Sequence, residues 1–139
     1  MFKIFFKKDT NKRIFKKVST KKSKKVSDFS KDEVEFLRQK INDRLEFYKS
    51  LYYEHGISLE WNRVSIRNQS TRWGSCSNKR NLNFNFKMKN LPNELFDYII
   101  VHELCHLLQM NHGVDFWKLV SIAFPDFQIL RSTLKSIRF

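Results

Sequence analysis

The stretch YIIVHELCHLLQMNH, from Tyr98 to His112, contains three of the four histidines of a 139-residue chain. His102 and His106 are four residues apart, so on a helix they project from one face, one turn apart, and can bind the same ion. Glu103 lies between them in the pattern HExxH. In that pattern the imidazoles bind zinc, while the carboxylate stays off the metal and acts as general base on a zinc-activated water. The alternative is a chance match with ordinary core histidines, which arises roughly once in several hundred chains of this length.

A catalytic zinc site needs three protein ligands and one open position. His112 is the candidate for the third ligand, because it lies six residues after His106, just beyond the expected end of the helix. The fourth histidine, His55, has no partner in the sequence and is interpreted as a surface or capping residue. The sequence therefore predicts zinc, or another divalent metal, bound by His102, His106 and His112, with Glu103 as the general base.

The histidine-bearing helix is expected to begin after Leu91-Pro92 and to run to about Met110. Proline is favoured in the first turn of a helix, and the carboxylates of Glu94 and Asp97 would interact well with the positive end of the helix dipole. Apolar residues along this segment supply a core-facing surface. The metal ligands would therefore be held on a buried, well-anchored helix.

Apolar residues at helical spacing predict three further helices. The longest spans about residues 31–54, with Ser30 as its N-cap and Glu33 in the position that completes a capping box. Two shorter helices are expected near the C-terminus, at residues 115–123 and 126–138, and Pro125 separates them.

Alternation of polar and apolar residues predicts strands. Residues 81–87 alternate and place Leu82, Phe84 and Phe86 on one face, and a second strand is expected around residues 64–66. Residues 74–78 are interpreted as the turn-rich connection between them. The segments FKIFF and RIFKKV near the N-terminus are expected to form short strands. These elements predict the α+β class, with a small antiparallel sheet packed against the histidine-bearing helix.

Composition excludes several classes of protein. Hydrophobic residues make up 41% of the chain and aromatic residues 15%, which is enough for one folded domain. No apolar run approaches the roughly 18 residues of a membrane-spanning helix, and the N-terminus lacks the apolar region of a signal peptide, so we expect a cytoplasmic protein. Cys76 and Cys105 are too few for a disulfide scaffold and form no CxxC zinc motif.

Positive charge is concentrated at the N-terminus. The net charge is +13, and residues 1–25 contain eleven Lys or Arg against one acid, Asp9, which gives this segment +10 and leaves +3 for the rest. Such a segment either contacts nucleic acid or an anionic surface, or is simply a solvated, lysine-rich stretch. We therefore divide the chain into a basic N-terminal arm, residues 1–29, and one folded domain, residues 30–139.

A set of motifs between residues 64 and 127 carries a family resemblance: Thr71-Arg-Trp-Gly-Ser-Cys-Ser77, Leu82-Asn83, Leu91-Pro92, Asp97-Tyr98, HELCH, Asn111-His112 and Phe116-Trp117. With these motifs the chain resembles the YgjP-like family of zinc metallopeptidases, which is related more distantly to the SprT-like and other zincin metalloproteases. The resemblance implies a zincin-like fold in which the three histidines bind zinc and Glu103 activates water. It also implies that RWGSCS lies near the active-site sheet.

Two features depart from the family pattern. Cys105 stands where the family usually has a small residue such as Ala; it is expected to pack in the helix, or else to be an oxidation-sensitive neighbour of the metal. The segment before Ser30 is shorter and more basic than the strand-rich N-terminal part of the family. Within RWGSCS, Trp73 and Cys76 are interpreted as core residues and Arg72 as a candidate substrate anchor.

Three functions are compatible with these residues. The first is a metallopeptidase acting on peptides or proteins. The second is nucleoside triphosphate pyrophosphohydrolysis, which the resemblance associates with UTP. The third is nucleic-acid binding through residues 1–25 with a structural metal, against which Glu103 argues, because a structural site needs no general base. We adopt the zinc-dependent hydrolase. The candidate substrate-binding residues, which could hold phosphates, are Arg67, Arg72, Lys79 and Arg80.

Overall fold

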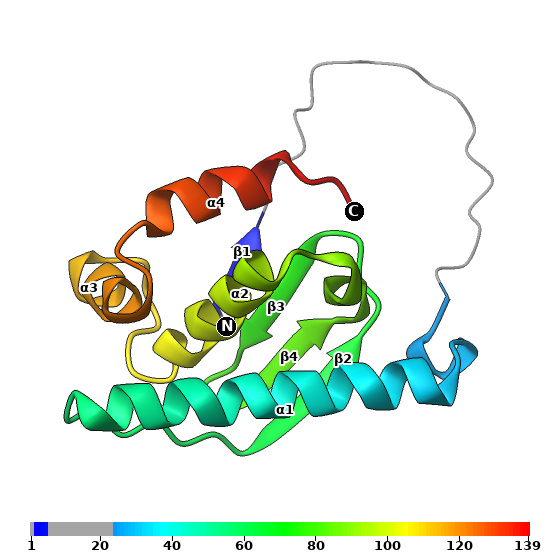
Figure 1. The fold of residues 1–139 in the computed structure, drawn as a ribbon, viewed down its shortest axis with the longest axis horizontal. Helices are drawn as coiled ribbons and strands as arrows, with labels where there is room; N and C mark the ends of the chain where they lie inside the picture. Colours follow the sequence, from blue (N-terminus) through cyan, green and yellow to red (C-terminus); the bar gives the residue numbers. More distant parts are fainter. Residues whose placement is uncertain (1, 6–23) are drawn as a thin grey trace.

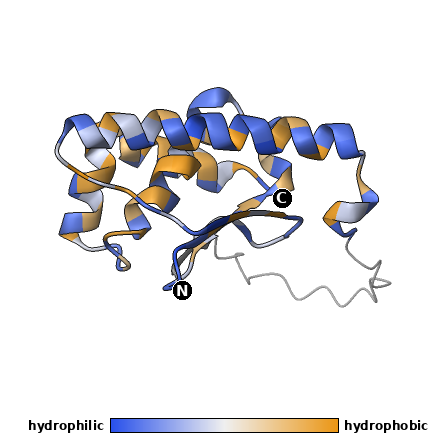
Figure 2. Cartoon of the chain, turned by 90° about the horizontal axis from the view of Figure 1, so that it is seen from below, coloured by the Kyte–Doolittle hydropathy of each residue, from blue (hydrophilic) through white to orange (hydrophobic). Residues whose placement is uncertain are grey.

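Sheet and helices form two layers in a computed structural model that describes residues 2–5 and 24–139 (Figure 1). Seen edge-on, the sheet lies on one side and the helices on the other (Figure 2). The helices are α1 (Lys31–Glu54), α2 (Asn93–His106), α3 (Val114–Ala123) and α4 (Phe127–Ser136), with short 3₁₀ helices η1 (Val26–Asp28) and η2 (Phe86–Asn90). The strands are β1 (Phe2–Phe5), β2 (Arg63–Arg67), β3 (Arg72–Cys76) and β4 (Asn81–Asn85). The α+β class is confirmed.

Helix α1 follows directly from its sequence pattern. It begins and ends where the apolar spacing predicts, and it buries one stripe of side chains: Leu37, Ile41, Leu45, Tyr48 and Tyr52. Ser30 is its N-cap as expected, although the Ser30 side chain makes no capping hydrogen bond. The stripe packs α1 against α2, so the stability of α1 comes from tertiary packing more than from its cap.

The sheet has the strand order β1-β3-β4-β2. β1 pairs with β3 and β3 with β4 in antiparallel fashion, but β2 and β4 are parallel, so the sheet is mixed and not wholly antiparallel as expected. Alternation encodes which side chains share a face and carries no information on strand order or direction. Strand β1 confirms the expectation for FKIFF, whereas RIFKKV lies outside the described residues.

The expected turn-rich connection at residues 74–78 is wrong for residues 74–76 and confirmed for residues 77 and 78. Gly74 and Cys76 belong to strand β3, whose residues from Trp73 to Cys76 are buried, and the turn to β4 follows at residues 77–80. Arg80 supplies the positive φ of 62° in that turn. Gly74 is small because Glu103 of α2 lies directly against it.

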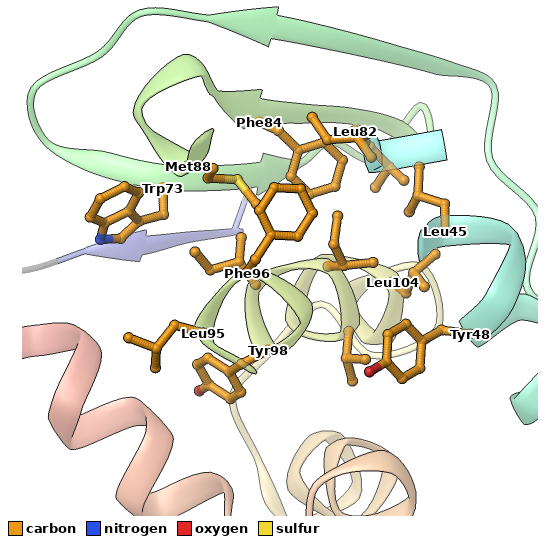
Figure 3. Close-up of a cluster of buried hydrophobic side chains, with 14 of the residues drawn as sticks. Leu45, Tyr48, Trp73, Leu82, Phe84, Met88, Leu95, Phe96, Tyr98 and Leu104 are labelled. Atoms are coloured by element: carbon orange, nitrogen blue, oxygen red, sulfur yellow. The ribbon is translucent and has the colours of Figure 1, made fainter. Parts of the chain in front are cut away.

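Helix α2 is the centre of the core and is buried on nearly all sides. Figure 3 shows Phe84 and Phe96 in the layer between the sheet and α2, with Leu45 beside them from α1, while Leu95 and Tyr98 point to the other side of α2, toward α4. The helix ends at His106 instead of about Met110, because residues 107 and 108 form a turn. His102 and His106 therefore lie in the last two turns of a helix that is packed on nearly all sides, and His112 follows in the loop before α3.

Helices α3 and α4 begin and end within two residues of the predicted bounds.

Asp97 of α2 has hydrogen-bond partners on α1, in addition to its position near the start of the helix dipole. Its two oxygens accept hydrogen bonds from Arg44 at 2.9 and 2.7 Å, and the second also accepts one from Tyr48 at 2.9 Å. This half-buried cluster ties α1 to α2.

Candidate metal centre

The side chains of His102, His106 and His112 converge at the C-terminal end of α2. The distances from His102 Nε2 are 3.1 Å to His106 Nε2 and 3.2 Å to His112 Nε2, and one ligand atom from each of the three lies within 4.8 Å of the others. Two nitrogens bound to one tetrahedral zinc at about 2.05 Å would be roughly 3.3 Å apart. The three imidazoles could therefore hold a divalent metal with little movement.

Lowered pKa values keep these imidazoles in the neutral form that binds metals, although only His102 and His106 are buried and His112 is exposed. Loss of solvent is the main cause that lowers the pKa of all three histidines, to about 4 for His106 and well below its usual range for His102. The positive charge of Arg131 adds to the effect on His102 and His112. Because protonated imidazole cannot bind a metal, the lowered pKa values favour binding at neutral pH.

The orientation of His106 is fixed from outside the centre. Its Nδ1 lies 3.0 Å from the backbone carbonyl of Gln109, and since a carbonyl only accepts hydrogen bonds, Nδ1 donates. The lone pair is then on Nε2, which faces the other two histidines. The ring also stacks on Phe116 at 4.5 Å, and His112 stacks on Trp117 at 6.0 Å. Helix α3 thus provides an aromatic wall that holds two of the three rings.

Glu103 lies against strand β3 and is fully buried. Neither carboxylate oxygen has a hydrogen-bond partner among residues 2–5 and 24–139. Burial raises the pKa of Glu103 well above its usual range, and the charge of Arg72 acts in the opposite direction. A buried carboxylate with no protein partner is typical of a group that acts on water or a ligand rather than one that stabilises the fold.

Comparison with known proteins agrees with this geometry. Residues 4–137 match the family described as YgjP-like, metallopeptidase domain. The chain belongs to the YgjP-like family. No curated protein matches it.

Two crystal structures share the YgjP-like fold seen here. The metallopeptidase zymogen abylysin of Pyrococcus abyssi superposes with a TM-score of 0.59 at 24% sequence identity, over 69% of this chain and 92% of abylysin. The metallopeptidase zymogen jannalysin of Methanocaldococcus jannaschii gives a TM-score of 0.55 at 24% identity, over 69% of this chain and 94% of jannalysin. The fold is therefore similar to that of these two metallopeptidase zymogens.

Membership in the YgjP-like metallopeptidase family places the chain among the metallohydrolases, which need a divalent metal, with zinc the usual one. The family match starts at residue 4, so it extends well beyond residues 64–127, which carried the resemblance in the sequence, and includes most of the basic segment. Within the described ranges, no helix is long and apolar enough to cross a membrane.

The four basic residues expected to bind substrate lie at two ends of the YgjP-like sheet. Arg67 ends β2 and Arg72 begins β3, and both are near Asn85, whose amide donates to the Arg72 carbonyl. Lys79 and Arg80 are exposed in the turn at the other end. Of the four, Arg72 is the one whose charge acts on Glu103, and its Nε donates to Gln69 at 2.7 Å. As substrate ligands, all four stay a prediction.

Both cysteines pack in the core of the YgjP-like domain. Cys76 and Cys105 are free thiols, each at most 1% exposed, and burial raises the pKa of both to about 12. The Cys105 sulfur lies 3.5 Å from the Tyr52 hydroxyl of α1. Cys105 thus fills the space between α1 and α2, and neither thiol is in the form that reacts with oxidants. Trp73 is buried as expected.

Arg131, a neighbour of the candidate metal centre, could not be predicted from the sequence around the HExxH motif. Arg131 of α4 lies with its guanidinium carbon 5.1 Å from the centre of the Trp117 ring. It is far from the HExxH motif along the chain, and only the packing of α4 against α2 brings it close. Phe116 and Trp117, by contrast, belong to the motifs that indicated the family.

Proposed function

We propose that the chain is a zinc metallopeptidase in which His102, His106 and His112 bind zinc and Glu103 is the general base. The observation that carries this proposal is the convergence of three imidazoles at the end of α2, together with Glu103 on the same helix, a buried carboxylate that has no partner in the described part of the chain. When bound, zinc would lower the pKa of a water molecule and polarise the peptide carbonyl.

Each residue has a distinct part in this proposal. Loss of solvent lowers the pKa of the buried His102 and His106 and of the exposed His112, which favours the neutral imidazoles. The Gln109 carbonyl and Phe116 hold His106 in one tautomer and orientation. Glu103 takes the proton of the attacking water on its carboxylate and passes it to the nitrogen of the departing amine. The apolar surroundings of Glu103 raise its affinity for that proton.

Peptide hydrolysis is the better supported reaction. The family and both structural neighbours are metallopeptidases, whereas no comparison supports a nucleotide substrate. A triphosphate site needs several cations close together. Arg67 and Arg72 lie at one end of the sheet, with Lys79 and Arg80 at the other, which does not favour such a site.

The test compares wild-type protein with Glu103→Gln and His112→Ala. We expect one zinc per chain and cleavage of a proteome-derived peptide mixture by the wild type. Glu103→Gln should keep its zinc and lose at least about 100-fold in rate, and His112→Ala should lose zinc. His55→Gln is the matched control, because His55 is exposed at the end of α1, away from the cluster, and its Nδ1 is hydrogen-bonded to the Leu51 carbonyl of the same helix.

Two outcomes would contradict the proposal. Peptide cleavage that survives in Glu103→Gln would exclude its role as general base. Pyrophosphate release from UTP by the wild type, lost in Glu103→Gln and without peptide cleavage, would assign the centre to nucleotides instead.

Nucleic-acid contact through residues 1–25 stays a prediction, for which no comparison gives support. Its test should neutralise lysines between residues 7 and 25 rather than delete the segment, because deletion also removes β1 from the sheet. Binding to DNA that weakens steeply with salt, and less steeply after neutralisation, is the result expected if the segment contacts phosphates. Absence of DNA binding at low salt would exclude nucleic-acid contact through residues 1–25.

A further inference from the structure

A pocket of about 610 Å³ lies beside His112, between helices α3 and α4. One wall is aromatic: Trp117 and Phe127 stack with ring centres 4.8 Å apart and nearly parallel planes, 14° from each other. Trp117 is also stacked with His112, with ring centres 6.0 Å apart. The pocket and the candidate metal centre therefore share a wall, and a molecule bound in the pocket would extend to His112.

Two cations line the same pocket, Lys118 from α3 and Arg131 from α4. The guanidinium of Arg131 lies over the Trp117 ring at 5.1 Å, which fixes its position through a cation–π contact. Within residues 2–5 and 24–139, neither cation forms an ion pair with a carboxylate. Asp115 and Asp126 begin the same two helices, but neither lines the pocket.

A lone surface cation is ordinarily just solvated, but three observations distinguish this pair. The cations come from different helices, they line a concave surface with an aromatic wall, and that surface adjoins the candidate metal centre. The charge of Arg131 is also near enough to act on His112. A planar guanidinium matches a carboxylate with two parallel hydrogen bonds, and an ammonium adds a point charge.

We propose that this pocket is a substrate subsite in which Arg131 and Lys118 bind a carboxylate of the peptide next to the bond that is cleaved. The assignment rests on the proposed peptidase function. The carboxylate is either the C-terminus of the peptide or the side chain of an Asp or Glu, since both present the same group. An apolar part of the same residue would lie on Trp117 and Phe127.

Binding of small probes tests the subsite without catalysis. Zinc-loaded protein is titrated with N-acetylphenylalanine and its amide, and with N-acetylaspartate amide and N-acetylasparagine amide, while NMR follows the indole N–H of Trp117. In at least one pair we expect the carboxylate probe to bind about tenfold more tightly than its neutral amide. The pair that shows this difference tells whether the pocket binds a C-terminus or an acidic side chain.

Two variants serve as test and control. Arg131→Ala should abolish the difference in affinity. Lys135→Ala should keep it, because Lys135 is an exposed cation on the same helix outside the pocket. Equal binding in both pairs, no binding, or a preference that survives Arg131→Ala would overturn the subsite.

Cleavage of a peptide mixture separates this inference from the proposed function. We expect acidic residues, or free C-termini, to be enriched at one fixed position relative to the cut, and Arg131→Glu to replace that preference with Lys or Arg. Cleavage with no such enrichment would overturn the subsite and leave the peptidase intact. Probe binding in a protein that cuts no peptide would instead count against the peptidase and retain the carboxylate pocket.

Discussion

Gly74 of β3 lies directly against Glu103 of α2. A methyl group on the Gly74 Cα would come within 3.0 Å of Glu103 Cγ and 3.1 Å of both Glu103 Oε1 and the Asn83 carbonyl oxygen. Only a residue without a side chain lets strand and helix approach this closely. Gly74, the middle residue of β3, is thus small because the candidate general base occupies the space above it.

Replacing Gly74 with Ala should therefore disturb the strand and the base together. Because one of the blocking atoms belongs to the backbone of β4, a simple rotamer change cannot relieve the contact, and we expect a loss of about 1–3 kcal/mol in the free energy of unfolding. Peptidase activity should fall as well. Urea denaturation measures the first effect, with Gly113→Ala as control, since a methyl group there meets nothing within 4 Å. Equal stability of the two variants would show that β3 and α2 can separate freely.

Zinc should stabilise the folded protein through the three clustered histidines. A ligand that binds only the folded state at 100 times its dissociation constant adds about 2.7 kcal/mol, which is readily seen in a thermal melt. We expect zinc to raise the melting temperature of the wild type and of His55→Gln, and to have little effect on His102→Ala or His106→Ala. A zinc-dependent shift that persists in the last two variants would place the metal elsewhere.

The histidine pKa values predict how the stability of the metal-free protein depends on pH. The pKa of His106 is about 4 in the folded chain and about 6.5 when unfolded, so between these values the unfolded chain binds more protons and stability is lost as pH falls. Between pH 7 and pH 5, His106 alone should lower the free energy of unfolding by about 2 kcal/mol. The raised pKa of Glu103 acts in the opposite direction, so the measurement uses Glu103→Gln with a chelator. A second substitution, His106→Gln, should flatten the dependence, and an unchanged slope would contradict the assignment.

The cluster that joins α1 to α2 should matter more than the ion pairs on the surface. Asp97→Asn removes the charge of a carboxylate that binds Arg44 with two hydrogen bonds and Tyr48 with one, and should cost about 1–3 kcal/mol. Glu35→Gln breaks the exposed pair with Arg38 and should change stability by less than about 1 kcal/mol. Urea denaturation of both variants measures the two losses in the free energy of unfolding. Similar losses would mean that the Asp97 cluster stabilises the fold no more than an exposed ion pair does.

The sequence predicted those parts of the fold that depend on local periodicity. The bounds of α1 follow from apolar residues at helical spacing, and the convergence of His102 with His106 follows from their separation by one turn. The position of His112 was also predicted, although what brings it back to the centre is the start of α3, where Trp117 stacks on its ring.

Features that depend on packing between distant segments could not be predicted in this way. Gly74 is typical of a turn, and only its close contact with Glu103 of α2 explains why a buried strand contains a glycine there. The parallel pairing of β2 with β4 depends on strand order, which alternation does not encode. Arg131 reaches the centre from the last helix, so no pattern within the motif region could indicate it.

The pairing of β1 with β3 has a consequence for the order of events during synthesis. Phe2 pairs with Cys76 and Phe5 with Arg72, so β1 leaves the ribosome before its partner and can pair with β3 only after residues 6–71 and then β3 have been made. Strands β3 and β4, by contrast, are joined by a short turn and can pair as soon as both are complete. The β3–β4 hairpin therefore serves as the template on which the N-terminus is captured late, after closure of the longest loop in the sheet.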